Sequence, residues 1–284
     1  MKYKIKLSTV TTYKFGGYCN NFYKISNNDM NLFDEAFSNK ENFILGKGSN
    51  VAFSDKDYEG NVINPNFNEI SYIKNLGVVK VGASVFLPDL ARFYKDNNLI
   101  NAEFLIGIPG SVGGAVKMNA GAYGWEFSDI LSSIEVYNLV TKNIETLHKD
   151  DIKFSYRTSS NLENKIIISA TIIGTEGDPN LIKSRLKENI KYRKDTQPSA
   201  IYNAGSVFKN TDQYSAGELI DKAGLKGFSI DGVRVSTKHA NFFVASKGAS
   251  SSSLYKLVNH VKEVVDSKFG VSLQKEILFV GKFD

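Results

Sequence analysis

The stretch that decides the fold runs from Gly107 to Gly124 and reads Gly-Ile-Pro-Gly-Ser-Val-Gly-Gly-Ala-Val-Lys-Met-Asn-Ala-Gly-Ala-Tyr-Gly. Six of these 18 residues are glycine. Glycine has no side chain and adopts positive φ, so the run predicts a poor interior for a helix or a strand. It is too long and too apolar for a simple turn. We expect its backbone N–H groups to bind an anion such as phosphate; the alternative is a connection packed between two sheets.

A second glycine-rich loop lies upstream, where residues 43–55 read Phe-Ile-Leu-Gly-Lys-Gly-Ser-Asn-Val-Ala-Phe-Ser-Asp. Residues 43–45 and 51–53 are short apolar runs, which predict two strands joined by a tight turn. Such a turn suits a pyrophosphate that rests on backbone amides. The loop is neither a dinucleotide-binding Gly-x-Gly-x-x-Gly motif, because no amphipathic helix follows, nor a Walker loop, because Gly-Lys-Ser/Thr is missing.

Composition excludes several classes of protein. The 284 residues carry a mild net charge of +5 (35 basic, 30 acidic) without a basic stripe, so we expect no nucleic-acid partner. There is no apolar run of 18 residues and no signal peptide at the N-terminus, so we expect a cytoplasmic protein without membrane insertion. The single Cys19 excludes an internal disulfide and fits a reducing compartment.

Local patterns predict a mixture of helices and strands. Helices are expected at 29–37, 85–97, 178–191 and 254–269, and from Ser215, as the capping residue, to Ala223. Strands are expected at 62–63, 70–73, 78–81, 133–137, 143–147, 165–173 and 273–281, with two more around the Asp231-Gly232 turn. The fold class is therefore α+β.

Three polar residues near predicted strands are candidates for chemistry, and each has a structural alternative. Arg157 ends the segment Phe-Ser-Tyr-Arg and is either a cation aimed into a pocket or a solvated side chain on an edge strand. Ser206 follows Ala-Gly and is either exposed for chemistry or bonded to its own loop. Glu276 either acts in a site or faces water at a strand edge. The three histidines fit no triad and no zinc motif, so no metal site is expected.

These blocks, taken in order from residue 11 to residue 281, resemble the UDP-N-acetylenolpyruvoylglucosamine reductase (MurB) family. The resemblance rests on both glycine-rich loops, the Tyr-Arg pair at 156–157, the Asn-Ala-Gly-Ser segment at 203–206 and the run His-Ala-Asn-Phe at 239–242. The chain resembles the shorter, type II-like branch, because the insertion that carries a substrate-covering tyrosine is missing. Departures from the family pattern are Lys47, Thr211, and Gln274-Lys275 in a motif usually written Leu-Glu-Pro-Glu.

The resemblance implies a FAD-binding region of the vanillyl-alcohol-oxidase (PCMH) type over residues 1–185, in lobes of about 1–65 and 66–185. A smaller α+β substrate domain would follow over residues 186–284. It further implies non-covalent FAD, NADPH as co-substrate and UDP-N-acetylglucosamine enolpyruvate as substrate. No obligate protein partner is expected.

The resemblance also implies site residues, at the positions of this sequence that match the motifs of the family. The implied catalytic residues are Arg157, Ser206 and Glu276. The implied substrate contacts are Tyr123, Lys194 and Asn210. The implied cofactor contacts are Gly46, Gly48, Ser49, Asn50, Ile108, Pro109, Gly110, Ser111, Gly113, Gly114, Asn119 and Gly121.

In this reading a hydride from flavin N5 reaches the vinyl carbon of the substrate. Ser206 then protonates the adjacent carbon, while Arg157 and a protonated Glu276 stabilise the enolate. Two alternatives remain from the sequence: another FAD oxidoreductase of the same fold, or a non-catalytic UDP-sugar-binding homologue.

Overall fold

The computed structural model describes residues 1–38, 41–199 and 201–283, and it contains both helices and strands. It divides into two compact units. Unit 1 consists of Met1–Tyr3, Asn21–Lys47 and Gly60–Arg193, and unit 2 consists of Lys4–Asn20, Gly48–Glu59 and Lys194–Asp284. Residues 4–20 and 48–59 thus group with the C-terminal segment. That grouping depends on contacts between residues far apart in the sequence.

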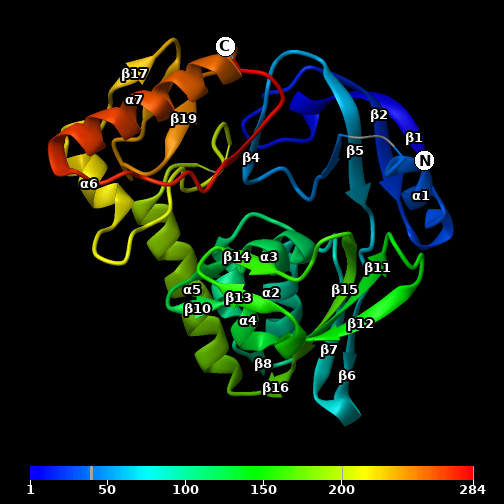
Figure 1. Cartoon of the computed structure of the whole chain (residues 1–284). Helices are drawn as coiled ribbons and strands as arrows, with labels where there is room; N and C mark the ends of the chain where they lie inside the picture. Colours follow the sequence, from blue (N-terminus) through cyan, green and yellow to red (C-terminus); the bar gives the residue numbers. More distant parts are fainter. Residues whose placement is uncertain (39–40, 200, 284) are drawn as a thin grey trace. The chain divides into compact units, whose positions relative to one another are not determined.

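A five-stranded antiparallel sheet forms the centre of unit 1, in the order β12-β11-β15-β7-β6 (Figure 1). Its strands are β6 (Ile70–Ile73), β7 (Val78–Gly82), β11 (Leu131–Asn138), β12 (Ile144–His148) and β15 (Lys165–Ile173). The central strand β15 is rich in isoleucine because most of its side chains are buried.

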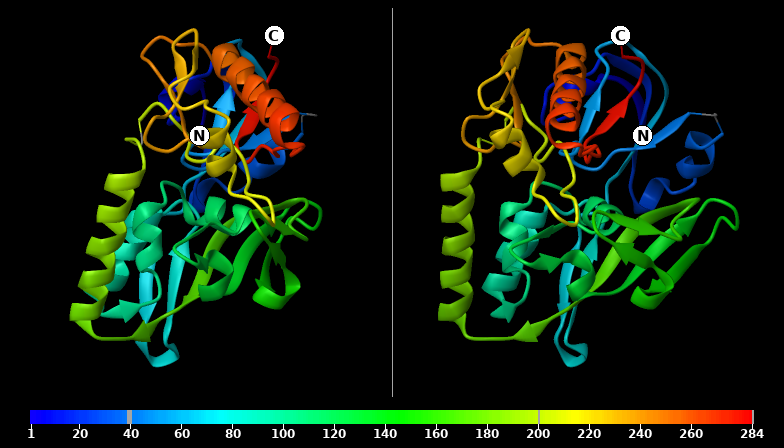
Figure 2. Two further views of the ribbon diagram at one scale, coloured as in Figure 1. Left: turned by 90° about the vertical axis from the view of Figure 1, so that its left-hand side faces the viewer. Right: turned by 60° about the vertical axis from the view of Figure 1, so that its left-hand side comes forward.

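Helices cover one face of this sheet and bury the core of unit 1. They are α2 (Leu87–Asp96), α3 (Val112–Met118), α4 (Phe127–Ile130) and α5 (Pro179–Thr196). Figure 2 shows α2 between α5 and the sheet. Ile182 and Leu186 of α5 are buried in the same apolar cluster as the sheet residues Val79 and Ile172. Unit 1 also contains the short elements α1 (Leu32–Ala36), β3 (Asn42–Ile44), β8 (Leu99–Ile100), β9 (Gly121–Ala122), β10 (Trp125–Glu126), β13 (Lys153–Ser155), β14 (Thr158–Ser160) and β16 (Thr175–Glu176).

Unit 2 packs α7 (Ser251–Phe269) against α6 (Ala216–Lys222) and a small antiparallel sheet (Figure 1). That sheet has the order β17-β18-β19, with β17 (Ser229–Ile230), β18 (Val233–Val235) and β19 (Phe243–Ala245). Asp231 and Gly232 both have positive φ, as the predicted two-residue turn between β17 and β18 requires. Ser250 caps α7 by accepting from the N–H of Ser253, and the apolar stripe of α7 is buried as predicted.

Long-range pairing ties an N-terminal segment into unit 2. The strand β4 (Val51–Phe53) pairs in parallel with β20 (Leu278–Val280), and the Tyr13 hydroxyl donates to the Phe243 carbonyl oxygen at 2.8 Å. A further sheet has the order β1-β2-β5-β3, with β1 (Lys2–Lys6), β2 (Tyr18–Ile25) and β5 (Tyr58–Pro65). Such pairings cannot be read from local patterns of the sequence.

Several predicted elements differ in detail. The glycine-rich stretch contains a helix, α3, because the Ser111 hydroxyl caps it by accepting from the Gly114 N–H. The region 29–37 forms a 3₁₀ turn over Asn27–Asp29 followed by α1. The helix expected to end near 191 continues to Thr196, two residues before Pro198. The last strand is limited to β20, so Glu276 precedes the strand.

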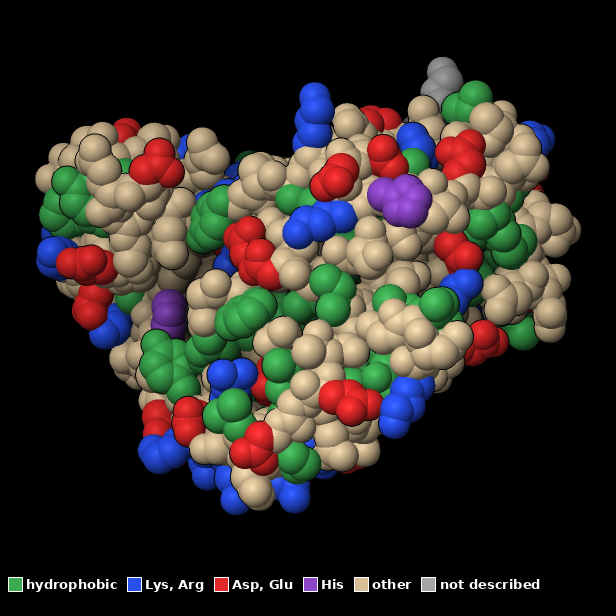
Figure 3. All heavy atoms as spheres, turned by 90° about the horizontal axis from the view of Figure 1, so that it is seen from below, with side chains coloured by type: hydrophobic (Ala, Val, Ile, Leu, Met, Phe, Trp, Pro, Cys, Tyr) green, Lys and Arg blue, Asp and Glu red, His purple; other side chains and the backbone are tan. Residues whose placement is uncertain are grey.

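The surface agrees with the mild net charge. On the face drawn in Figure 3, Lys and Arg side chains are interspersed with Asp and Glu, and that face carries no continuous basic stripe. Within residues 1–38, 41–199 and 201–283, no helix combines the length and apolar character needed to cross a membrane.

Candidate active site

Arg157 lies at the tip of a β-hairpin in unit 1. Strands β13 and β14 pair antiparallel, and Tyr156 and Arg157 form the two-residue turn between them. Arg157 has a φ of 54°, which is a left-handed conformation. Its side chain is only 19% exposed, so the alternative of a solvated edge arginine is wrong. The guanidinium carbon lies 4.8 Å from the centre of the Tyr156 ring, within cation–π range.

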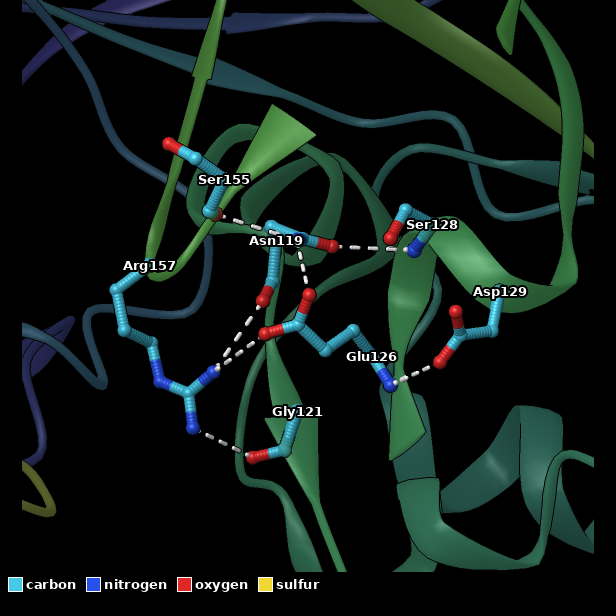
Figure 4. A network of polar contacts seen from close by, with 7 residues as sticks. All are labelled: Asn119, Gly121, Glu126, Ser128, Asp129, Ser155 and Arg157. Carbon is cyan, nitrogen blue, oxygen red and sulfur yellow. Dashed lines mark hydrogen bonds and ion pairs between the residues drawn. The ribbon is translucent and has the colours of Figure 1, made fainter. Parts of the chain in front are cut away.

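A neighbouring hairpin, β9 and β10, provides the contacts that hold the guanidinium (Figure 4). Arg157 Nη2 donates to the Gly121 carbonyl oxygen at 3.0 Å, and Nη1 lies 3.7 Å from Glu126 Oε1. Gly121 and Glu126 are register partners, so both contacts come from a single cross-strand pair. A Cβ on Gly121 would lie 2.5 Å from the Trp125 carbonyl oxygen and 3.2 Å from Arg157 Nη1, so this position requires glycine.

Asn119 stands at the centre of the same network (Figure 4). Its side-chain Nδ2 donates to Glu126 Oε2 at 2.7 Å and to the Ser155 carbonyl oxygen at 3.2 Å, and its Oδ1 accepts from the Ser128 N–H at 3.1 Å. The backbone of Asn119 is left-handed and ends α3. The side-chain amide is therefore engaged by protein groups on both its oxygen and its nitrogen.

The two glycine-rich loops meet in unit 1 at Gly46 and Ser111. A Cβ on Gly46 would lie 2.5 Å from the Ser111 hydroxyl oxygen. The second loop is anchored by backbone bonds on the segment before α2: the Leu87 N–H donates to the Gly110 carbonyl at 3.0 Å, and the Gly113 N–H donates to the Ala83 carbonyl at 2.8 Å. Ile108 and Pro109 lie in the same loop, and Gly114 lies in the first turn of α3. The two glycine-rich loops are thus adjacent at this contact.

The loop from Gly46 to Asn50 has backbone N–H groups that are available to bind an anion. None of its five backbone N–H groups donates to an acceptor among residues 1–38, 41–199 and 201–283. Gly48 is buried, and its carbonyl accepts from the Thr12 N–H at 3.0 Å and from the Thr12 hydroxyl at 3.1 Å. Consecutive N–H groups in such a loop bind anions. Ser49 is half-buried in this loop.

Ser206 and Glu276 lie on paired backbone segments of unit 2. The Glu276 N–H donates to the Val207 carbonyl at 2.8 Å, and an isolated bridge joins Phe208 to Lys275. Ser206 follows Gly205, whose φ is 75°, and is half-buried. Its hydroxyl makes no hydrogen bond to the part of the chain that the structure describes, so the alternative of a loop-bonded serine is wrong.

Asn50 links the first glycine-rich loop to this pair. Its Nδ2 donates to the Glu276 carbonyl at 3.1 Å, and its own carbonyl accepts from the Leu278 N–H at 3.1 Å. Within unit 2, consecutive hydrogen bonds therefore join Asn50 to Glu276 and Glu276 to Val207, the residue that follows Ser206.

The predicted substrate contacts have separate surroundings. The Tyr123 hydroxyl donates to the Asn189 carbonyl at 2.9 Å, and burial raises the pKa of Tyr123. Burial lowers the pKa of the neighbouring Arg193, which lies beside Gly107. Lys194 is exposed near the end of α5, and its carbonyl accepts from Lys238 Nζ.

Asn210 contributes a helix cap. Its Oδ1 accepts from the Ala216 N–H at 3.0 Å at the start of α6. Ser215 occupies the N-cap position of this helix as predicted, but its side chain makes no capping bond. An asparagine five residues before the cap position is not a sequence signal for helix capping.

Sequence reasoning missed Glu126. A local signal exists, because Glu126 and Asp129 form a capping box for α4, with the Glu126 N–H donating to Asp129 Oδ2 at 2.7 Å. That signal predicts a helix start and says nothing about Arg157, which lies 31 positions further along the chain.

Comparison with known proteins first shows the general class to which this protein belongs. The model of a family described as "FAD binding domain" matches residues 36–147, which include both glycine-rich loops. With the converging loops and the α+β architecture, this defines an FAD-binding flavoprotein, as predicted.

The particular family follows from the rest of the chain. A model described as "UDP-N-acetylenolpyruvoylglucosamine reductase, C-terminal domain" matches residues 197–280. The reductase of Anaplasma marginale is 37% identical over 279 residues, covering 98% of this chain and 92% of the relative. That of Orientia tsutsugamushi is 37% identical over 283 residues, covering 98% and 93%. The crystal structure of the Thermus caldophilus enzyme matches with a TM-score of 0.87 at 29% identity, covering 99% of both chains. The chain belongs to the UDP-N-acetylenolpyruvoylglucosamine reductase family.

Proposed function

We propose that the chain reduces UDP-N-acetylglucosamine enolpyruvate to UDP-N-acetylmuramate in the synthesis of peptidoglycan precursors, with NADPH as reductant and non-covalent FAD as cofactor. Residues 1–185 would serve mainly FAD and residues 186–284 mainly the substrate. The reaction would take place in the cytoplasm, where its nucleotide substrates are found. Family membership supports this function, and the hydrogen-bonded link from Asn50 through Glu276 to Val207 is the structural observation that carries it.

Bound FAD would supply the hydride from N5 to the vinyl carbon of the substrate. The protein must then deliver a proton to the carbon beside the carboxylate. Ser206 is suited to this role because its hydroxyl is half-buried and is not consumed by the described part of the chain. A serine is a weak acid, so the proton moves only if the developing enolate is stabilised.

Two residues would stabilise that anion. Arg157 provides a charge that persists at every working pH, on a side chain already held by Gly121 and Glu126. Glu276, which is half-buried before β20, would donate a hydrogen bond to the enolate if it is protonated there.

Cofactor and substrate binding would use other parts of the chain. The N–H groups of residues 46–50 and the loop around Ser111 would hold the FAD diphosphate. Tyr123, Lys194 and Asn210 would contact the UDP-sugar, with Lys194 as a cation for its diphosphate.

The test is an assay for the complete reaction. Purified protein with FAD is mixed with NADPH and the enolpyruvyl substrate, and the product is analysed by mass spectrometry. Oxidation of NADPH that depends on the substrate, together with a product that has gained two hydrogen atoms, supports the proposal. NADPH oxidation that depends only on oxygen would indicate a different flavoenzyme.

A further inference from the structure

We infer that Glu126 is a positioning residue for Arg157, and that Asn119 in turn holds Glu126. This inference rests on the proposed catalytic role of Arg157. It starts from the hairpin turn that carries the arginine. A side chain at the tip of a two-residue turn is normally free to rotate into solvent, but the Arg157 side chain is 81% covered. Its direction must therefore be fixed by neighbouring groups.

The anchoring groups differ in what they can do. The carbonyl oxygens of Gly121 and Asn119 accept from the guanidinium at 3.0 and 3.5 Å, and they are neutral. Glu126 is the charged anchor of the network in Figure 4, with Oε1 at 3.7 Å from Arg157 Nη1. Because its side chain is 35% exposed, the pair is only partly screened by water. Charge attraction therefore favours one orientation of the guanidinium over rotation away from the β9–β10 pair.

Glu126 is itself held in one conformation. Its second oxygen, Oε2, accepts from Asn119 Nδ2 at 2.7 Å. The Asn119 side chain cannot rotate without losing hydrogen bonds, because it also donates to the Ser155 carbonyl and accepts from the Ser128 N–H. These three partners fix which side-chain atom is oxygen and which is nitrogen. Asn119 is 1% exposed, so each lost bond would leave a buried polar group unsatisfied.

The consequence for the reaction follows from geometry. A catalytic charge stabilises an anion only when it is correctly oriented before the reaction starts. Glu126 would therefore affect protonation and hydride acceptance by the substrate, and it would not affect reduction of the flavin by NADPH. A merely structural carboxylate would affect both steps alike, through lower flavin content or stability.

The central variant is Glu126→Gln, which keeps the size of the side chain and an acceptor for Asn119 but removes the charge. We expect oxidation of reduced flavin by the enolpyruvyl substrate to slow roughly 10- to 100-fold, with flavin reduction by NADPH unchanged. The matched control is Glu135→Gln. Glu135 makes an ion pair with Lys80 at 2.8 Å in the same unit, and its side chain is 34% exposed, but it lies outside the network. The control should change neither step.

A double-mutant cycle shows whether the effect passes through the arginine. In an Arg157→Ala background, Glu126→Gln should cause no further slowing. The inference is overturned if Glu126→Gln leaves the substrate step at the wild-type rate. It is also overturned if the slowing is equally large in the Arg157→Ala background, or if both steps and the flavin content fall together.

A measurement on the flavin-free wild-type protein needs neither a variant nor activity. The order parameter of the Arg157 Nε–H bond, measured by ¹⁵N relaxation, should be about 0.8 or higher, as for a rigid group. A value below about 0.6 would contradict the inference. If the wild-type enzyme is not reoxidised by the enolpyruvyl substrate, the proposed function fails, and this order parameter still decides whether Arg157 is held.

Discussion

The backbone N–H of Glu276 donates a hydrogen bond to the Val207 carbonyl oxygen at 2.8 Å, which brings the residue after Ser206 opposite a glutamate 69 positions further along the chain. Local sequence gives no sign of this pairing. The pairing is made by backbone atoms. The side chains of Ser206 and Glu276 can therefore each be changed without removing it.

Ser206→Ala removes the proposed proton donor while keeping the backbone pairing. We expect the substrate step to slow by about 10²- to 10⁴-fold, because a positioned proton donor contributes that much. Flavin reduction by NADPH should not change. Stopped-flow absorbance measures both steps, and Ser215→Ala is the matched control, since Ser215 is exposed and makes no capping bond. A Ser206→Ala enzyme with a normal substrate step would exclude Ser206 as the donor.

Glu276→Gln replaces the carboxyl by an amide of the same size. Flavin reduction should remain intact, and the second half-reaction should slow by roughly 10²-fold if the group stabilises the enolate. The exposed Glu263 on α7 offers a control as Glu263→Gln. Unchanged oxidation of reduced flavin by substrate in the Glu276→Gln enzyme would remove Glu276 from the mechanism.

Gly46→Ala introduces a methyl group 2.5 Å from the Ser111 hydroxyl oxygen. The hydroxyl must rotate away from the N-terminus of α3, so we expect a loss of about 1 kcal/mol in unfolding free energy, the usual value of such a cap. Ser111→Ala should cost a similar amount, and the double variant should cost no more than one of them. Chemical denaturation measures these values, and additive losses would contradict the proposed clash.

Asn210→Ala removes the bond to the Ala216 N–H and should cost about 1 kcal/mol in unfolding free energy. Asn210→Asp keeps an oxygen acceptor and should retain stability. If the Asn210 amide N–H₂ also contacts the substrate, Asn210→Asp will raise KM without lowering the melting temperature. An Asn210→Asp enzyme with the wild-type KM would restrict Asn210 to its capping role.

The stability of the protein should depend on pH through His239. Burial lowers the pKa of His239 below its ordinary value of 6.5, and the charge of Lys226 lowers it further. The unfolded chain therefore takes up a proton near pH 6.5 that the folded chain resists. Stability should fall as pH decreases from 6.5 to the lowered pKa, and then level off. Denaturation at several pH values measures this decline; His239→Gln should flatten it and Lys226→Gln should reduce it. If the stability of the His239→Gln variant declines with pH as much as that of the wild type, other groups cause the decline.

The sequence allowed prediction of elements with strong local patterns. The stripe on α7 and the Asp231-Gly232 turn follow from side-chain spacing and backbone preference, and both are present. It failed where one side-chain hydrogen bond decides the outcome. The Ser111 hydroxyl caps α3 within a glycine-rich stretch, and the Asn210 side chain, in place of that of Ser215, accepts from the first N–H of α6.

The candidate site, too, contains some residues that the sequence could indicate and one that it could not. Glycine content predicted both loops, and the family motifs indicated Arg157, Ser206 and Glu276. Neither could reveal Glu126, because its contact with Arg157 depends on how the β9–β10 hairpin meets the turn between β13 and β14. Contacts of this kind join segments that carry no common sequence pattern.

The most direct test of the central claim is a two-step anaerobic stopped-flow measurement on the wild-type protein with FAD. NADPH is added first, and the enolpyruvyl substrate second, while the visible absorbance of oxidised flavin is followed. We predict that the absorbance bleaches with NADPH and recovers rapidly with the substrate in the absence of oxygen. Absorbance that bleaches but recovers only when oxygen is admitted would contradict the claim that this chain is a UDP-N-acetylenolpyruvoylglucosamine reductase.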